Sequence, residues 1–125
     1  MKRVTRDIDP KDAQDLLEWV PRVCMAFAGE GGPQAQPMMF EWREGRCLAG
    51  IPENEDNKPN PGNEVVILID EGLHFFDLRA LYMRGHVEPI PVPEHAPVGY
   101  TWFELNPIKT VAWDYGTLRE VQDDR

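Results

Sequence analysis

The stretch LHFFDLRALYMRGHVEPI, from Leu73 to Ile90, decides the fold, because its apolar pattern changes phase partway through. Even positions 76, 78 and 80 are apolar first, and odd positions 81, 83 and 87 are apolar afterwards. Alternation with a period of two is typical of a strand with one buried face, and a slip of one residue turns every later side chain to the other face. A β-bulge near Arg79–Ala80 would produce this slip within one bent strand.

A helix is the alternative for the same stretch. Asp77 could cap a helix over LRALYMR that ends at Gly85. The preceding segment favours the bent strand, because EVVILID, from Glu64 to Asp70, is a continuous run rich in β-branched residues. Such a run predicts a strand that is covered on both faces, and Glu71–Gly72 would join it to the next strand by a tight turn. We therefore predict a strand with a bulge.

Twelve prolines and ten glycines divide the remaining chain into short apolar segments, which is typical of a mostly β domain. One helix is predicted over residues 10–20, with Asp9 as its N-cap and an apolar stripe of Leu16, Leu17 and Val20. We expect a single domain over residues 1–125. Its other expected parts are strands over 22–28, 34–42 and 46–50, a Pro/Asn-rich loop over 51–63, a closing segment broken at Asn106–Pro107 and ending near 113, and a polar tail over 114–125 that frays.

The charge balance excludes two classes of partner. The chain has 22 acidic and 13 basic residues, a net charge of −9, whereas nucleic-acid and anionic-membrane surfaces need clustered Lys and Arg. No apolar run is long enough to span a membrane, and the N-terminal residues contain no apolar signal segment. Cys24 and Cys47 could form a bridge on adjacent strands, but two free thiols in a cytoplasmic protein are the better interpretation.

The residue spacings predict no metal site and no catalytic motif. The histidines at 74, 86 and 95 lack ligand spacing with one another or with the cysteines. Tyr82, Arg84, His86 and Glu88 alternate along one strand face, which is most simply a solvated face, although Arg84 could hold a phosphate. Met38–Met39 would place one methionine inside and one outside. The catalytic residues are therefore unknown at this stage.

Three segments taken in order resemble the pyridoxamine 5′-phosphate oxidase-like flavin-binding split-barrel family. LIDEGLHFFDLRALYMRGHVEPI is similar to a strand pair of the family, and WFELNPIKTVAWDYGTLRE is similar to its closing segment. GGPQAQPMMFEWREGRCLAG is similar to its early hairpin. Together with the helix AQDLLEW, these segments extend the resemblance over most of the chain.

The resemblance implies a six-stranded Greek-key split β-barrel with a short N-terminal helix, and a homodimer. It implies flavin mononucleotide (FMN) at the dimer interface, or in some branches a deazaflavin, and a small-molecule substrate. Haem binding, known in another branch, is a remote option. The flavin ring would rest against the strand from Pro37 to Trp42. The residues expected to bind the cofactor are Pro37, Met38, Met39, Lys58, Arg84 and Trp113.

The chain departs from the family where a short basic helix normally holds the phosphate. The loop IPENEDNKPNPGN, from Ile51 to Asn63, stands in that place, its prolines exclude a regular helix, and Lys58 is its only base. The bases that could substitute are Lys58, Arg46, Arg79 and Arg84. Two functions follow: a flavin-dependent oxidoreductase, or a split barrel that has lost the flavin and serves as a small-molecule binding or structural dimer.

Overall fold

The computed structural model describes residues 2–5, 10–20, 22–74, 77–114 and 119–122. The described part is mostly β structure with one helix, as predicted. In chain order the elements are β1 (Lys2–Thr5), α1 (Pro10–Trp19), β2 (Arg22–Gly29), β3 (Gly32–Pro37), β4 (Met39–Arg43), β5 (Arg46–Pro52), β6 (Glu64–Glu71), β7 (Arg79–Ile90), β8 (Tyr100–Asp114) and β9 (Arg119–Gln122).

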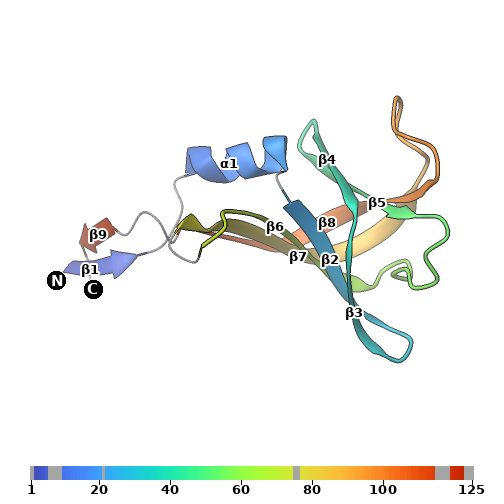
Figure 1. The fold of residues 1–125 in the computed structure, drawn as a ribbon, viewed down its shortest axis with the longest axis horizontal. Helices are drawn as coiled ribbons and strands as arrows, with labels where there is room; N and C mark the ends of the chain where they lie inside the picture. Colours follow the sequence, from blue (N-terminus) through green and yellow to red (C-terminus); the bar gives the residue numbers. More distant parts are fainter. Residues whose placement is uncertain (1, 6–9, 21, 75–76, 115–118, 123–125) are drawn as a thin grey trace.

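Seven strands form one curled antiparallel sheet in the order β3-β2-β6-β7-β8-β5-β4 (Figure 1). The first and last strands of this order, β3 and β4, are consecutive in the chain and are separated only by Met38. The sheet must therefore curl until its two edges meet at Met38, which makes it a split barrel. The family resemblance implied six strands, whereas this sheet has seven. We also predicted one strand over residues 34–42. The structure breaks this strand at Met38 and pairs its halves with different neighbours, β2 and β5.

The stretch from Leu73 to Ile90 contains a turn followed by a strand. The Asp77 carboxylate accepts a hydrogen bond from the backbone N–H of His74 at 2.8 Å, and the backbone N–H of Asp77 donates to the His74 carbonyl at 3.1 Å. Strand β7 begins two residues later and buries its odd-numbered side chains from Leu81 to Val87. The helix alternative is therefore wrong. Ala80 and Leu81 are both buried, so the phase of burial changes between these two residues, inside β7.

The bulge lies elsewhere than predicted. No irregularity occurs at Arg79–Ala80, which pair in register with Asp114 and Trp113. Instead Arg84 pairs with Lys109 while Gly85 pairs with Pro107, so Ile108 of β8 is the extra residue. The predicted break at Asn106–Pro107 is wrong, because β8 runs continuously through both residues, which pair with His86 and Gly85.

Helix α1 closes one side of the core. It contacts β4, β6 and β7, and Leu16 and Leu17 are buried in the same cluster as the inward side chains of the sheet. Val20 packs against that cluster, so the predicted stripe is confirmed. No helix in the described part of the chain is long and apolar enough to cross a membrane.

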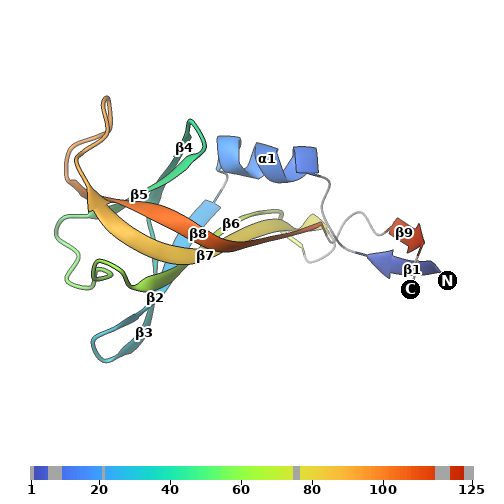
Figure 2. The same cartoon turned by 180° about the vertical axis from the view of Figure 1, so that it is seen from behind.

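The two ends of the chain form an unexpected second sheet. Strand β9 pairs antiparallel with β1, with Lys2 opposite Gln122 and Thr5 opposite Arg119, and both views show the two strands side by side (Figure 2). The prediction of a frayed tail over 114–125 is therefore wrong for residues 119–122. The apolar pattern of the sequence did not predict this pairing, because four-residue strands are too short for their periodicity to identify a distant partner.

Candidate functional site

The strand register brings apolar side chains together on the outer face of the barrel. One row across five strands consists of Pro37, Cys24, Leu68, Tyr82 and Val111, and the next consists of Ala35, Ala26, Val66, Arg84 and Lys109. Residues that pair across antiparallel strands point to the same face. Because Met25, Ile67 and Met83 between these rows are buried in the core, both rows face outward.

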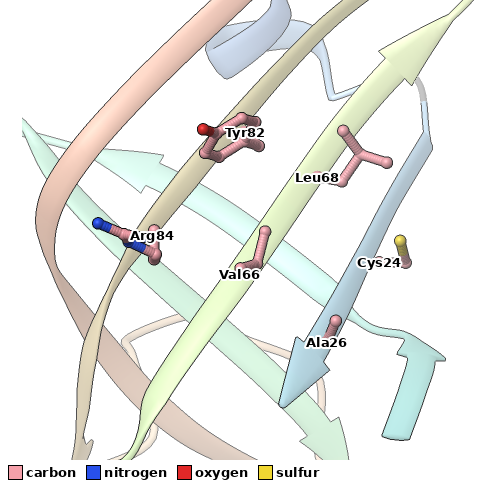
Figure 3. Close-up of a pocket in the computed structure, with 6 residues that line it drawn as sticks. All are labelled: Cys24, Ala26, Val66, Leu68, Tyr82 and Arg84. Atoms are coloured by element: carbon pink, nitrogen blue, oxygen red, sulfur yellow. The ribbon is translucent and has the colours of Figure 1, made fainter. Parts of the chain in front are cut away.

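A hollow of about 450 Å³ lies on this face. The residues that line it are Cys24, Ala26, Val66, Leu68, Tyr82 and Arg84 (Figure 3). This volume is within the range of about 300–1,000 Å³ that is usual for small-molecule sites. The hollow, which we call the ring hollow, therefore has an apolar floor formed by β2 and β6 and a polar rim formed by β7.

Strand β6 shows that this face lacks a cover. Its continuous apolar run predicted burial on both faces, and Val65, Ile67 and Ile69 are indeed buried. The alternate side chains, Val66 and Leu68, remain partly exposed in the single chain. The sequence therefore has the composition of a covered strand on a face that the chain alone leaves open.

An aromatic pair borders the ring hollow. The rings of Tyr82 and Trp113 have centroids 5.3 Å apart at an angle of 42°. Tilted pairs at this distance are attractive and hold both rings in place. Trp113, one of the predicted cofactor residues, thus lies next to the hollow through Tyr82 rather than in its lining.

The thiol of Cys24 on the hollow floor is neutral at physiological pH. Partial burial and, to a smaller extent, the negative charge of Asp70 raise the pKa of the Cys24 thiol. Cys47 is buried on the core side, and both cysteines are free, as predicted. The two thiols do not lie on adjacent strands, since β2 and β5 are not neighbours in the sheet.

One cation, Arg84, lines the rim of the ring hollow, and a second, Lys109, lies next to it on β8. The Arg84 guanidinium lies 3.1 Å from the Glu64 carboxylate, and the side chains of both residues are about half exposed, at 45% and 51%. Lys109 pairs with Arg84 across β7 and β8 and is exposed. The rim therefore offers two positive charges against one carboxylate.

The other three candidate phosphate bases are engaged elsewhere. Arg46 makes a two-pronged ion pair with Glu104, with contacts of 2.7 and 3.1 Å. Arg79 is paired with Glu71 and lies 3.6 Å from Asp12 of the helix. The Lys58 ammonium donates to the carbonyls of Glu53 and Glu55 at 2.9 and 2.6 Å. Of the four predicted candidates, Arg84 is the one that faces the ring hollow.

The predicted ring platform forms a second, smaller hollow. Pro37, Met38 and Met39 line a space of about 210 Å³ together with Pro52 and Tyr100. Met38 and Phe40 pack against the core, so Met39 between them points outward, as predicted. Pro37 is the register partner of Cys24, which links this space to the ring hollow at the seam of the barrel.

The six predicted cofactor residues thus fall into three places. Arg84 lines the ring hollow and Trp113 borders it; Pro37 to Met39 lie at the seam; and Lys58 lies in its own loop. Sequence reasoning did not select Cys24, Leu68 or Lys109 for the site. Only the strand register could have identified these three residues. For Lys109, the one-residue bulge at Ile108 places it, instead of Ile108, beside Arg84.

No metal centre is present in the described ranges, where no group of three His, Cys, Asp or Glu side chains is close enough to hold an ion. The three histidines are all exposed. This agrees with the sequence prediction that the histidines are surface residues.

Comparison with known proteins identifies the fold. No family model and no curated protein matches the sequence. Among solved structures, a conserved hypothetical protein from Mycobacterium tuberculosis superposes with a TM-score of 0.68 at 15% identity, covering 92% of this chain and 90% of the other. An FAD binding protein from Mycobacterium smegmatis gives a TM-score of 0.63 at 14% identity, covering 93% and 98%.

A third similar structure carries the name of the enzyme family. It is a candidate pyridoxamine 5′-phosphate oxidase from Corynebacterium glutamicum, with a TM-score of 0.60, 12% identity and coverage of 89% and 90%. The chain therefore has the fold of the pyridoxamine 5′-phosphate oxidase-like split-barrel proteins, as its sequence motifs predicted.

Proposed function

We propose that the chain binds a flavin in the ring hollow and acts as a flavin-dependent oxidoreductase on a small molecule. The observation that supports this most is an apolar hollow of about 450 Å³ with cations at its rim, on a fold shared with a flavin-binding protein. A flat aromatic ring matches the apolar floor, and an anionic tail matches Arg84 and Lys109.

The residues of the hollow divide the work of binding. Val66, Leu68 and Ala26 offer apolar contact to a ring, and Tyr82, fixed by Trp113, limits its position on the β7 side. A bound flavin would supply hydride transfer, and the chain would supply position and electrostatics. The same surface would accept FMN or a deazaflavin, because both have a fused aromatic ring and a phosphorylated tail.

We also propose that the chain forms a homodimer. The apolar outer face of β6 is only partly buried, and a homodimer would cover it together with the ring. Twofold dimers are the commonest soluble homo-oligomers. Both cysteines are free, which supports the cytoplasmic location that the sequence suggested.

Two observations favour the alternative function, a small-molecule binding barrel without flavin. Glu64 holds Arg84 in an ion pair. A loop replaces the usual phosphate-binding helix, and its lysine, Lys58, donates hydrogen bonds to backbone carbonyls of the same loop. In that case the ring hollow would take an uncharged apolar molecule and would reject the phosphorylated tail.

Flavin titration with a thiol readout tests the proposal. Cys24 lines the ring hollow, whereas Cys47 is 1% exposed, so a thiol reagent modifies Cys24 first. We expect riboflavin, FMN or a deazaflavin coenzyme to lose or shift its fluorescence on binding and to slow the modification of Cys24. Fluorescence that stays unchanged and labelling that is not slowed by any of these ligands would reject the flavin function in favour of the alternative.

A further inference from the structure

A polar hollow of about 360 Å³ lies beside the ring hollow. It is formed where the end of β2 meets the loop between β5 and β6. The residues that line it are Ala28, Gly29, Glu30, Asp56, Asn57, Lys58 and Asn60. We call it the loop hollow.

The two hollows are neighbours along one strand face. Ala26 lines the ring hollow and Ala28 lines the loop hollow. Residues two apart in a strand point to the same face and lie about 7 Å from each other. A ligand that leaves the ring hollow along β2 therefore enters the loop hollow.

Contacts on both sides hold the loop in place. The Gln36 side-chain amide donates to the Asn57 carbonyl at 3.0 Å, and the Gly62 N–H donates to the Val87 carbonyl at 2.8 Å. The hydrogen bonds from Lys58 to the carbonyls of Glu53 and Glu55 tie the loop to itself. The hollow is therefore already formed in the protein without a ligand.

The chemistry of the loop hollow is unsuited to a phosphate. Its one cation, Lys58, is engaged by two backbone carbonyls, while the carboxylates of Glu30 and Asp56 line the same space. The side-chain amides of Asn57 and Asn60 can each donate and accept, and both are without a hydrogen-bond partner among the described residues. Such a set suits a neutral group that carries hydroxyls and an amino group.

We propose that the loop hollow binds the nucleoside end of a flavin dinucleotide, so that the chain selects FAD over FMN. This proposal rests on the flavin function proposed above. FMN ends in a phosphate, which Arg84 and Lys109 would hold at the rim, so FMN has no group that reaches the loop hollow. In FAD the phosphates lie between two uncharged ends: Arg84 and Lys109 at the rim would serve the phosphates, and the loop hollow would serve the ribose hydroxyls and the adenine amino group.

Titrations of the full chain with FAD, FMN and riboflavin test the selection. The double variant Asn57→Ala/Asn60→Ala removes the two amides, and Asn54→Ala is the matched control, because Asn54 is exposed in the same loop and does not line the hollow. We expect the wild type to bind FAD more tightly than FMN. Each neutral hydrogen bond that is lost should weaken FAD binding by about 2- to 10-fold, with FMN and riboflavin unchanged.

The possible results separate this inference from the flavin function. FAD binding weakened in the double variant alone, with the control unchanged, supports the loop hollow as the nucleoside site. Equal affinity of the wild type for FMN and FAD, or an equal loss for all three ligands in the double variant, overturns the selection while the flavin function stands. Absence of binding by every flavin overturns both.

Discussion

The guanidinium of Arg84 lies 3.1 Å from the carboxylate of Glu64, across the pair of strands that borders the ring hollow. Arg84 pairs with Val66 and Glu64 pairs with His86, so Arg84 and Glu64 are diagonal neighbours on one face of the two strands. The Glu64 carboxylate is thus already paired with the guanidinium that we propose as the binding group for an anionic ligand. Binding of a phosphorylated ligand therefore competes with this ion pair.

Removal of Arg84 should lower the affinity for FMN, and removal of the Glu64 charge should raise it. Arg84→Ala removes a charge-assisted contact, and we expect FMN to bind about 10- to 150-fold more weakly, with riboflavin unaffected because it lacks the phosphate. Glu64→Gln releases Arg84. Because exposed ion pairs contribute little, the gain for FMN should be at most about fivefold.

Two further variants control for net charge and for the loop. Arg46→Ala also removes one positive charge, but the Arg46 guanidinium is paired with Glu104. The affinity for FMN should therefore stay at the wild-type value. Lys58→Ala tests the other predicted base, whose ammonium bonds two loop carbonyls. An equal loss for FMN and riboflavin in Arg84→Ala would show that Arg84 supports the hollow itself and does not bind the phosphate.

Cys24 should react as a single, slow thiol. Its pKa is raised, mainly by burial, so its thiolate fraction at neutral pH is below that of an ordinary cysteine, whose pKa is about 8.5. We expect one thiol per native chain to react with a neutral maleimide and two to react in denaturant. The rate should keep rising with pH beyond about 8.5, and a plateau below that pH would contradict the raised pKa.

Cys47 should make the fold sensitive to alkali. Burial, with a smaller contribution from the charge of Glu104, raises the pKa of Cys47 to about 11, whereas in the unfolded chain it titrates near 8.5. Between these values the unfolded chain releases a proton that the folded chain keeps, so stability falls as pH rises. This contribution is fully present below about pH 8.5 and decreases by up to about 1.4 kcal/mol per pH unit above it.

The variant Cys47→Ala isolates that dependence. It removes the titrating group, so the difference between the unfolding free energies of wild type and variant should shrink from pH 8 to pH 11 in urea titrations. Cys24→Ala serves as the comparison, because Cys24 is less buried. A difference that stays constant over this range would mean that the Cys47 thiol titrates normally in the folded chain.

The proposed dimer is tested on the face that holds the ring hollow. Leu68→Arg places a charge on the outer side of β6, away from the core, so the variant should fold and remain monomeric. Light scattering should give 14.4 kDa for the variant and twice that mass for the wild type. Val98→Arg is the control, because Val98 is 92% exposed and lies outside both rows of this face.

The sequence predicts the positions of the strands better than it predicts which strands pair with each other. The runs over residues 22–28 and 64–70 have clear apolar patterns, and the structure has β2 and β6 at those places. The apolar pattern around Met38 does not indicate that the strand changes its pairing partner there. Pro37 and Met39 are both extended, and only their partners, Cys24 and Gly50, belong to different strands. Sheet closure is a long-range property that a local pattern does not contain.

The candidate site was predictable to the extent that one strand defines it. The alternation over Tyr82, Arg84 and His86 places Arg84 on an outward face, as the structure shows. The neighbours of Arg84 depend on pairing between distant strands. One extra residue at Ile108 decides that Lys109 lies beside Arg84. Pro107 indicates an irregularity at this place in the sequence, but it does not determine which residue is the extra one.

Gly85 should be the most sensitive glycine of the barrel, because it lies at this bulge. A Cβ built on Gly85 would be 2.1 Å from the carbonyl oxygen of Asn106 and 2.8 Å from the Cα of Pro107, and both are backbone atoms of β8. At Gly50 the nearest atoms, 2.9–3.1 Å away, belong to the side chain of Trp102, which can tilt. Gly85→Ala must therefore separate β7 from β8, whereas Gly50→Ala needs only a ring to move.

We expect Gly85→Ala to lower the unfolding free energy by about 3 kcal/mol and Gly50→Ala to lower it by about 1 kcal/mol, the two ends of the usual range for overpacking. Urea titrations with an unchanged slope would measure both values, since the slope reports the surface exposed on unfolding. The separation of β7 from β8 would also move Lys109 away from Arg84. FMN affinity of folded Gly85→Ala should therefore fall while that of Gly50→Ala is kept, and the reverse order in either measurement would show that the bulge does not set the position of Lys109.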